Sequence, residues 1–215
     1  MMMMTTIEIP QEYQSLHKNL SEFVKESTKE FDDSHNHVHM LNVVQNTLRI
    51  LHNDESVQQK SIQFPDISRL SLVVAWLHDV RDHKYPNSIS EEELREYIDS
   101  VEPTETDNIL EIIANISYSK EAKGLRKSFP EPYQTILDIV TDADRLEALG
   151  LVGIERCETF TKEHGGKVPE DVILHCHEKL LRLLPCGYFK TDYGRILAAP
   201  LHQEILEYVQ KYENP

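Results

Sequence analysis

Three short stretches of the sequence concentrate side chains that bind metal ions. SHNHVHM places histidines at alternate positions, LHDV overlaps the end of the apolar run LSLVVAWL, and DADRLEALG carries acidic residues in an apolar helical pattern. Imidazole and carboxylate groups together suit ions such as Mn, Fe, Co, Ni, Zn or Mg. The three stretches contribute His35, His37 and His39, then His78 and Asp79, and finally Asp142 and Asp144.

The pair His78-Asp79 is the strongest of these signals. A lone histidine on an apolar helix is more often a hydrogen-bonded core residue than a metal ligand. A carboxylate beside LSLVVAWL, however, carries a large desolvation cost unless a partner such as a divalent cation compensates for it. Asp144 lies in a similar apolar context. One histidine of the first stretch, the His-Asp pair and Asp144, on three helices of one bundle, would form a four-ligand site.

The spacing of apolar residues predicts the helices that must position these groups. A first amphipathic helix covers 11–30, and a second presents Met40 and Leu51 on one face. The run that starts at Asp66 is apolar nearly all round, which is typical of a helix in the middle of a bundle. Residues 53–65 are predicted to be a loop.

The second half of the chain shows the same helical pattern. Ser90 and Glu93 have the spacing of a capping box that opens a short acidic helix. YSKEAKGLRKSFPEP is predicted to be a basic loop. Strand patterns are absent, so we predict an all-α, single-domain helical bundle. Further helices are predicted over 104–118, 132–146, 147–164, 169–184 and 192–212.

The histidines of SHNHVHM are predicted to have unlike roles. Asp32, Asp33 and Ser34 offer N-cap chemistry for the helix that follows. His39 lies on the apolar stripe of that helix and is expected to face the core, whereas His37 is expected to face solvent. A metallo-β-lactamase HxHxDH motif or an amidohydrolase HxH motif is excluded, because each requires β-strands that this sequence does not show.

Composition limits the partners of the protein. The chain of 215 residues has 22 Lys and Arg against 37 Asp and Glu, a net charge of −15. This charge argues against a nucleic-acid partner, because phosphate backbones require clustered cations. No apolar stretch approaches the ~18–20 residues of a membrane span, and no signal peptide is evident. We expect a cytoplasmic protein, or alternatively a nuclear one, with its three cysteines reduced.

In these motifs the sequence resembles the HD-domain metal-dependent phosphohydrolases, whose pattern is H…HD…D. Here the pattern is His39, then LHDV, then DADRL. The similarity is closest to predicted HD hydrolases that include bacterial deoxynucleoside triphosphate pyrophosphohydrolases. SHNHVHMLNV, ISYSKE, DADRLEALG and HCHEKLL follow the motif order of that group, over about residues 30 to 210.

The resemblance implies a role for each matching residue. One divalent ion (Mn, Co, Ni, Fe, Zn or Mg) would be held by His39, His78, Asp79 and Asp144. Asp82 would position or deprotonate the attacking water. The chain would divide into an N-terminal helix, 1–30, that packs on an HD domain, 31–212, whose C-terminal helices complete the pocket. The expected substrate-binding residues are His35, Lys84, Lys120, Lys123, Arg145, His175 and Lys179. Lys84, Lys120, Lys123 and Arg145 are expected from charge, because a chain of net charge −15 needs local cations to bind a polyphosphate.

Two residues depart from the pattern of the group: Asn36 stands in place of Asp, and Asn42 in place of Arg. Neither is an expected ligand, so metal binding should persist, while orientation or specificity changes. Three functions stay open. A nucleotide pyrophosphohydrolase is favoured over a nucleoside 5′-monophosphatase or phosphodiesterase, and over a non-catalytic metal- or nucleotide-binding module. The expected partner is a small nucleotide, and a homodimer stays open.

Overall fold

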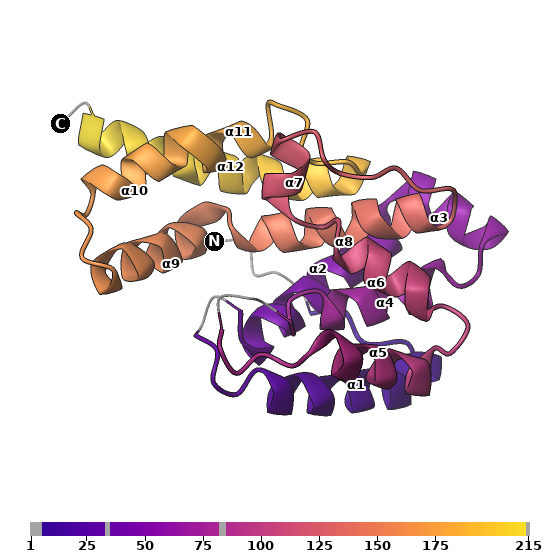
Figure 1. Ribbon diagram of the computed structural model, residues 1–215. Coiled ribbons are helices and arrows are strands. Elements are labelled where there is room, and N and C mark those ends of the chain that lie inside the picture. The colour runs from indigo at the N-terminus through magenta and orange to yellow at the C-terminus, as the bar shows by residue number, and fades with distance from the viewer. Residues whose placement is uncertain (1–5, 33–34, 82–84, 214–215) are drawn as a thin grey trace.

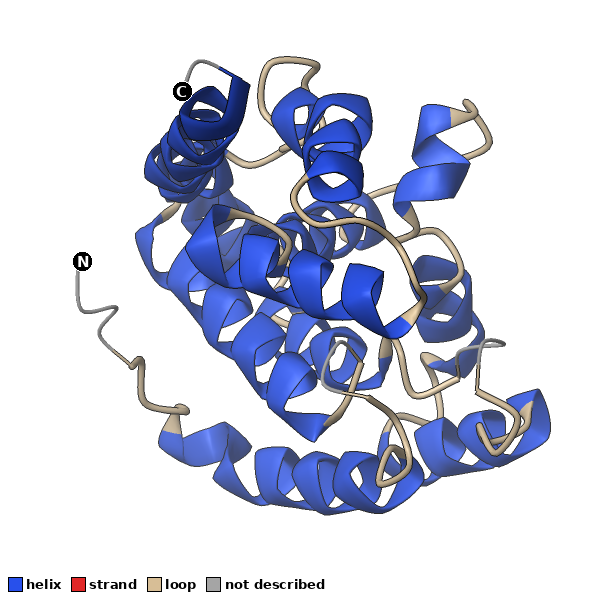
Figure 2. Cartoon of the chain, turned by 90° about the vertical axis from the view of Figure 1, so that its left-hand side faces the viewer, coloured by secondary structure: helices blue, strands red, loops and turns tan. Residues whose placement is uncertain are grey.

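The described chain is built from helices alone (Figures 1 and 2). The computed structural model describes residues 6–32, 35–81 and 85–213. The predicted all-α class is therefore confirmed. The helices are α1 (Gln14–Ser27, after a 3-10 turn at Gln11–Tyr13), α2 (His37–Asn53), α3 (Glu55–Gln63), α4 (Ile67–Leu77), α5 (Glu91–Val101), α6 (Thr106–Ile113), α7 (Tyr118–Ala122), α8 (Tyr133–Glu147), α9 (Gly150–Glu163), α10 (Glu170–His175), a π-helical segment (Cys176–Leu180), α11 (Leu181–Leu183) and α12 (Asp192–Glu213).

Helices α2, α4 and α8 pack against one another and form the centre of the main core. The apolar residues of α4 are buried on every side of the helix, as its sequence predicts. Trp76 is fully buried and its Nε1 donates a hydrogen bond to His17 Nδ1 at 3.1 Å, which fixes α1 against α4. The three stretches that carry the predicted ligands therefore lie on or directly beside the helices at the centre of the core.

A second apolar cluster joins the C-terminal helices to the end of α8. Leu183, Phe189 and Ile205 are buried in this cluster. Helices α10, α11 and α12 run along one side of the molecule, and α9 lies below α10 in Figure 1. In the described ranges no helix combines the length and the apolar character required to span a bilayer.

The start of α2 differs from the prediction. Asn36 is the N-cap, because its side chain accepts from the N–H groups of Val38 at 2.8 Å and His39 at 3.3 Å. The predicted cap lay at 32–34, and positions 33 and 34 are outside the described residues. His37 is half-buried and its Nε2 lies 2.8 Å from Ser21 Oγ, so the prediction that it faces solvent was wrong.

Two predicted loops contain helices. Region 53–65 holds α3, whose single buried residue, Val57, gives no apolar periodicity to detect. The basic segment after Ile116 begins with the short helix α7. The capping box of α5 is confirmed, since Ser90 Oγ accepts from Glu93 N and the Glu93 carboxylate accepts from Ser90 N.

The Asp54 carboxylate joins two helices that are far apart in the sequence. Its Oδ1 accepts from the N–H groups of Ser56 and Val57 at the start of α3, both at 3.1 Å. Its Oδ2 accepts from Tyr193 N at the start of α12 at 2.8 Å. Burial alone would raise the pKa of Asp54, but these hydrogen bonds outweigh it and lower the pKa below its ordinary value.

We predict that Asp54→Ala lowers the free energy of unfolding by about 2 kcal/mol at pH 7, because three N–H groups at two helix starts, that of Val57 buried, lose their acceptor. The stabilisation from a carboxylate with a lowered pKa is complete above about pH 4 and is lost as the pH falls through the folded-state pKa. Urea unfolding of wild type and variant should therefore converge in acid. Asp66→Ala, at an exposed position whose side chain caps no N–H group, is the control. An equal effect of both substitutions would contradict this account.

Candidate metal centre

Three central helices bring the predicted ligands to one place. His39 lies in the first turn of α2, His78 is the C-terminal cap of α4 with Asp79 directly after it, and Asp144 lies near the end of α8. Each ligand lies on or directly beside a helix whose apolar face must be buried. Packing of these three faces against one another therefore brings the ligands together.

The ligand atoms of His39, His78 and Asp144 all lie within 4.8 Å of one another, a cluster that could hold a metal ion. Asp144 Oδ1 is 3.4 Å from His39 Nε2 and 3.7 Å from His78 Nε2. Asp79 Oδ2 lies 3.8 Å from His39 Nε2 and 3.6 Å from His78 Nε2. All four predicted ligands are thus grouped, with the two imidazoles buried and the two carboxylates about a third exposed.

The orientation of His78 fits a metal ligand. Its Nδ1 lies 2.9 Å from the Ala75 carbonyl oxygen, to which an N–H at that position donates. This bond leaves Nε2 facing the cluster, where it makes no hydrogen bond to any described residue although it is buried. A backbone carbonyl on the distal nitrogen is the usual support of a metal-binding imidazole. The donor set and this uncompensated nitrogen therefore fit a divalent cation.

His35 extends the cluster toward solvent. Its Nε2 is 3.8 Å from Asp79 Oδ2, and its Nδ1 is 3.2 Å from the Tyr85 hydroxyl. The Tyr85 ring stacks on Phe31 at 4.0 Å between centroids. His35 therefore lies beside the grouped ligands, where the sequence predicts a substrate-binding residue.

The cluster opens into a pocket of about 1600 Å³. The pocket is bounded by α5 and α6 on one side, and by α9, α10 and the π-helical segment on the other. Among the predicted substrate-binding residues, His35, Lys120, Arg145, His175 and Lys179 line it. The C-terminal helices thus contribute to the pocket wall.

The other predicted residues are placed differently. Asp82 and Lys84 lie outside the described residues. Lys123 is exposed and does not line the pocket. Lys120 Nζ donates to the Ala114 carbonyl at 2.5 Å. The Arg145 guanidinium is 4% exposed and bonds the Glu121 carboxylate and the Tyr188 carbonyl, so its two terminal nitrogens are already engaged.

Glu147 is a pocket residue that we did not predict from the sequence. Its Oε2 accepts from Asn42 Nδ2 at 2.9 Å, and its Oε1 accepts from Asn46 Nδ2 at 3.1 Å. Its position three residues after Asp144 on a helix is the signal that could have identified it. The departure at Asn42 therefore has a structural role, because the amide holds this carboxylate at the edge of the pocket.

We predict that metal binding releases a proton and becomes tighter as the pH rises. Burial opposes a charge on His78, but Asp79 and Asp144 outweigh it and raise the pKa of this imidazole to about 9. At pH 7 the metal must therefore displace a proton from His78, and affinity should rise up to ~tenfold per pH unit below pH 9. Calorimetric titration with Mn²⁺ in buffers of different ionisation enthalpy counts the protons. Binding at pH 7 without proton release would contradict this assignment.

Comparisons with known proteins agree with this architecture. No protein-family model matches the sequence. Crystal structures of Bacillus subtilis YpgQ, one of them in complex with ADP, share the fold with a TM-score of 0.68 and 23% identity, over 92% of this chain and 96% of YpgQ in that complex. An HD-superfamily hydrolase from Bacillus thuringiensis gives a TM-score of 0.65 and 22% identity, over 93% and 96% of the two chains. A Lactobacillus plantarum protein gives 0.70 and 21%, over 93% and 96%.

The sequence comparison goes further than the fold. YpgQ, described as an uncharacterized protein, is 35% identical to this chain over 146 residues, which cover 65% of this chain and 68% of YpgQ. Over that length such identity indicates common descent. The fold is also shared by a protein described as an HD-superfamily hydrolase. This chain belongs to the YpgQ family.

Proposed function

We propose that the protein is a metal-dependent phosphohydrolase that acts on nucleotides. The observation that carries the proposal is the group of two imidazoles and two carboxylates that line a large pocket. Membership of the YpgQ family and the fold of HD-superfamily hydrolases support hydrolysis as the reaction class.

His39, His78, Asp79 and Asp144 would hold one divalent metal ion. When bound, the ion acidifies a coordinated water and neutralises charge on a phosphoryl oxygen. The protein fixes the ligands, because Ala75 orients His78 and the first turn of α2 orients His39. We propose Asp82, three residues beyond Asp79, as the group that positions or deprotonates the attacking water.

A nucleotide substrate is supported by the pocket and by a relative. The volume of about 1600 Å³ exceeds the usual 300–1000 Å³ range of small-ligand pockets, so a nucleotide fits. YpgQ has been crystallised with ADP. Lys120 and Lys179 line the pocket and supply local positive charge in a chain of net charge −15, which a polyphosphate requires. His175 also lines the pocket, but burial lowers the pKa of its imidazole, so it would act as a neutral hydrogen-bonding group.

Within this class we favour a (deoxy)nucleoside triphosphate pyrophosphohydrolase, because the motifs of this chain follow one another in the order found in that group. A nucleoside 5′-monophosphatase or phosphodiesterase is the alternative chemistry for the same ligand set. The products separate them: pyrophosphate with a nucleoside monophosphate supports the first, and orthophosphate from a monophosphate supports the second.

We predict that the purified protein releases pyrophosphate from at least one nucleoside triphosphate when Mn²⁺, Co²⁺, Ni²⁺ or Mg²⁺ is supplied, and that a chelator abolishes the release. A coupled assay that records pyrophosphate and orthophosphate separately, over ribo- and deoxyribonucleotide panels, measures both products. Orthophosphate without pyrophosphate would replace the pyrophosphohydrolase by the alternative. No turnover with any of the metals would overturn the hydrolase proposal.

We predict that Asp79→Ala lowers kcat/KM more than about 100-fold and abolishes bound metal, since it removes a ligand. Metal content after dialysis is measured by atomic emission, and kcat/KM by the same coupled assay. Asp107→Ala is the matched control, because this carboxylate also lines the pocket but pairs with Arg95 at 2.7 Å. Full activity in a folded Asp79→Ala protein would show that the site is wrongly assigned.

A further inference from the structure

Arg145 is a buried cation beside the proposed metal centre. It directly follows Asp144 on α8, is 4% exposed, and lines the same pocket as the grouped ligands. A guanidinium that lost its partners there would seek the nearest carboxylates, because an unpaired buried charge is strongly unfavourable. The metal-binding carboxylates lie in that pocket, so the anchoring of Arg145 bears on the metal centre.

Glu121, on α7, is the carboxylate that anchors Arg145. Its Oε2 accepts from Arg145 Nη2 at 2.5 Å and from Arg126 Nη1 at 3.0 Å, and its Oε1 is 2.5 Å from Lys190 Nζ. The side chain of Glu121 is only 13% exposed. Burial would raise the pKa of Glu121, but hydrogen bonds from Lys190 and Arg145 outweigh it and keep the pKa below its usual range. Glu121 is therefore ionised at neutral pH.

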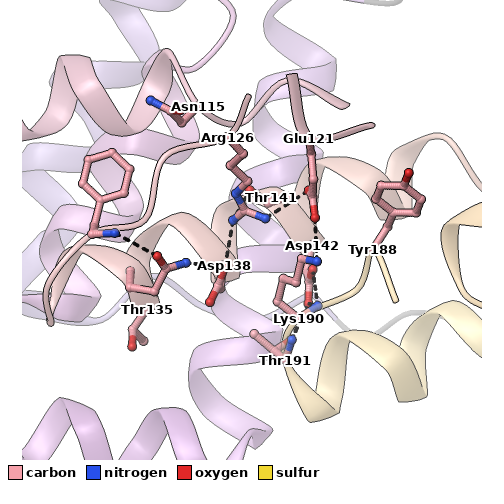
Figure 3. Close-up of polar contacts among 12 residues, drawn as sticks. Asn115, Glu121, Arg126, Thr135, Asp138, Thr141, Asp142, Tyr188, Lys190 and Thr191 are labelled. Atoms are coloured by element: carbon pink, nitrogen blue, oxygen red, sulfur yellow. Dashed lines mark hydrogen bonds and ion pairs between the residues drawn. The ribbon is translucent and has the colours of Figure 1, made fainter. Parts of the chain in front are cut away.

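Figure 3 shows Glu121, Arg126, Asp138, Asp142 and Lys190 of the network around Arg145. The Arg126 guanidinium also donates to Asp138 Oδ1 at 2.8 Å. Asp142 accepts from the backbone N–H of Lys190 at 2.8 Å and of Thr191 at 2.7 Å. Arg126, Arg145 and Lys190 thus all pair with Glu121, and Arg126 also pairs with Asp138.

Arg145 depends on Glu121 more than the other two cations do. Arg126 keeps Asp138 if Glu121 is lost, and Lys190 Nζ also donates to the Gly187 carbonyl at 2.7 Å. Among its hydrogen bonds and ring contacts with described residues, Arg145 would keep the Tyr188 carbonyl and the Tyr188 ring, whose centroid lies 5.4 Å from its Cζ. Neither of these contacts carries a full negative charge.

We propose that Glu121 is a positioning residue that holds Arg145 away from Asp79 and Asp144, and so keeps these carboxylates free for a cation. The inference rests on the proposed metal centre. If the inference holds, helix α7 affects metal affinity through Glu121, although this helix of five residues contributes no ligand. Glu121 acts through Arg145 and touches neither metal nor substrate.

The test is metal affinity, measured by calorimetric titration of the full-length protein with Mn²⁺. We expect Glu121→Gln to weaken Mn²⁺ binding roughly tenfold or more, the range typical of residues that support a metal site. The double variant Glu121→Gln/Arg145→Met should bind within about threefold of wild type, because the competing cation is removed as well. Arg145→Met alone should also stay within about threefold.

Glu102→Gln controls for the loss of a buried carboxylate, since Glu102 is 3% exposed, pairs with Arg69 and does not line the pocket. It should lower thermal stability without weakening Mn²⁺ binding. Unchanged affinity in Glu121→Gln would overturn the proposal, and so would a double variant that binds as weakly as the single one. If Glu121→Gln does not fold, a folded double variant that binds more than tenfold more weakly than Arg145→Met overturns it. A wild-type protein that binds no Mn²⁺ contradicts the metal centre itself.

Discussion

The structure depends on one electrostatic constraint: two carboxylates and two buried imidazoles share a small volume at the junction of α2, α4 and α8. The His78 imidazole has one nitrogen tied to the backbone and the other aimed at Asp79 and Asp144 without a hydrogen bond to any described residue. Such a group is stable only if a positive charge lies among the carboxylates. A proton on His78 supplies that charge in the free protein, and a divalent cation can replace it.

The rest of the chain positions this group and shapes access to it. The three central helices bury their apolar faces together, so the ligands are fixed by the core rather than by loops. The C-terminal helices have their own apolar cluster. They join α8 through Asp142, whose carboxylate accepts hydrogen bonds from the backbone N–H groups of Lys190 and Thr191. A Cβ on Gly194 would lie 2.5 Å from Asp142 Oδ2, so this approach requires glycine. The pocket is thus lined by residues from both apolar clusters, which meet on α8.

Sequence patterns were sufficient for the fold class and for the grouping of His39, His78 and Asp144, because each lies on or beside an apolar helix whose burial is obligatory. They missed α3, since polar residues dominate it and its start depends on Asp54. They also missed the anchoring of Arg145, because Glu121 and Lys190 are remote in sequence and meet it only through tertiary packing. Periodicity predicts which faces are buried, but it does not pair individual charges across the fold.

The central claim is that these four side chains bind one divalent cation. The most direct measurement is anomalous X-ray diffraction from crystals of the protein grown with Mn²⁺. The account predicts a single strong anomalous peak about 2.0–2.3 Å from His39 Nε2, His78 Nε2 and an oxygen of Asp144, with Asp79 completing the set. A peak at other residues, or an empty site in crystals soaked at millimolar Mn²⁺, would contradict it.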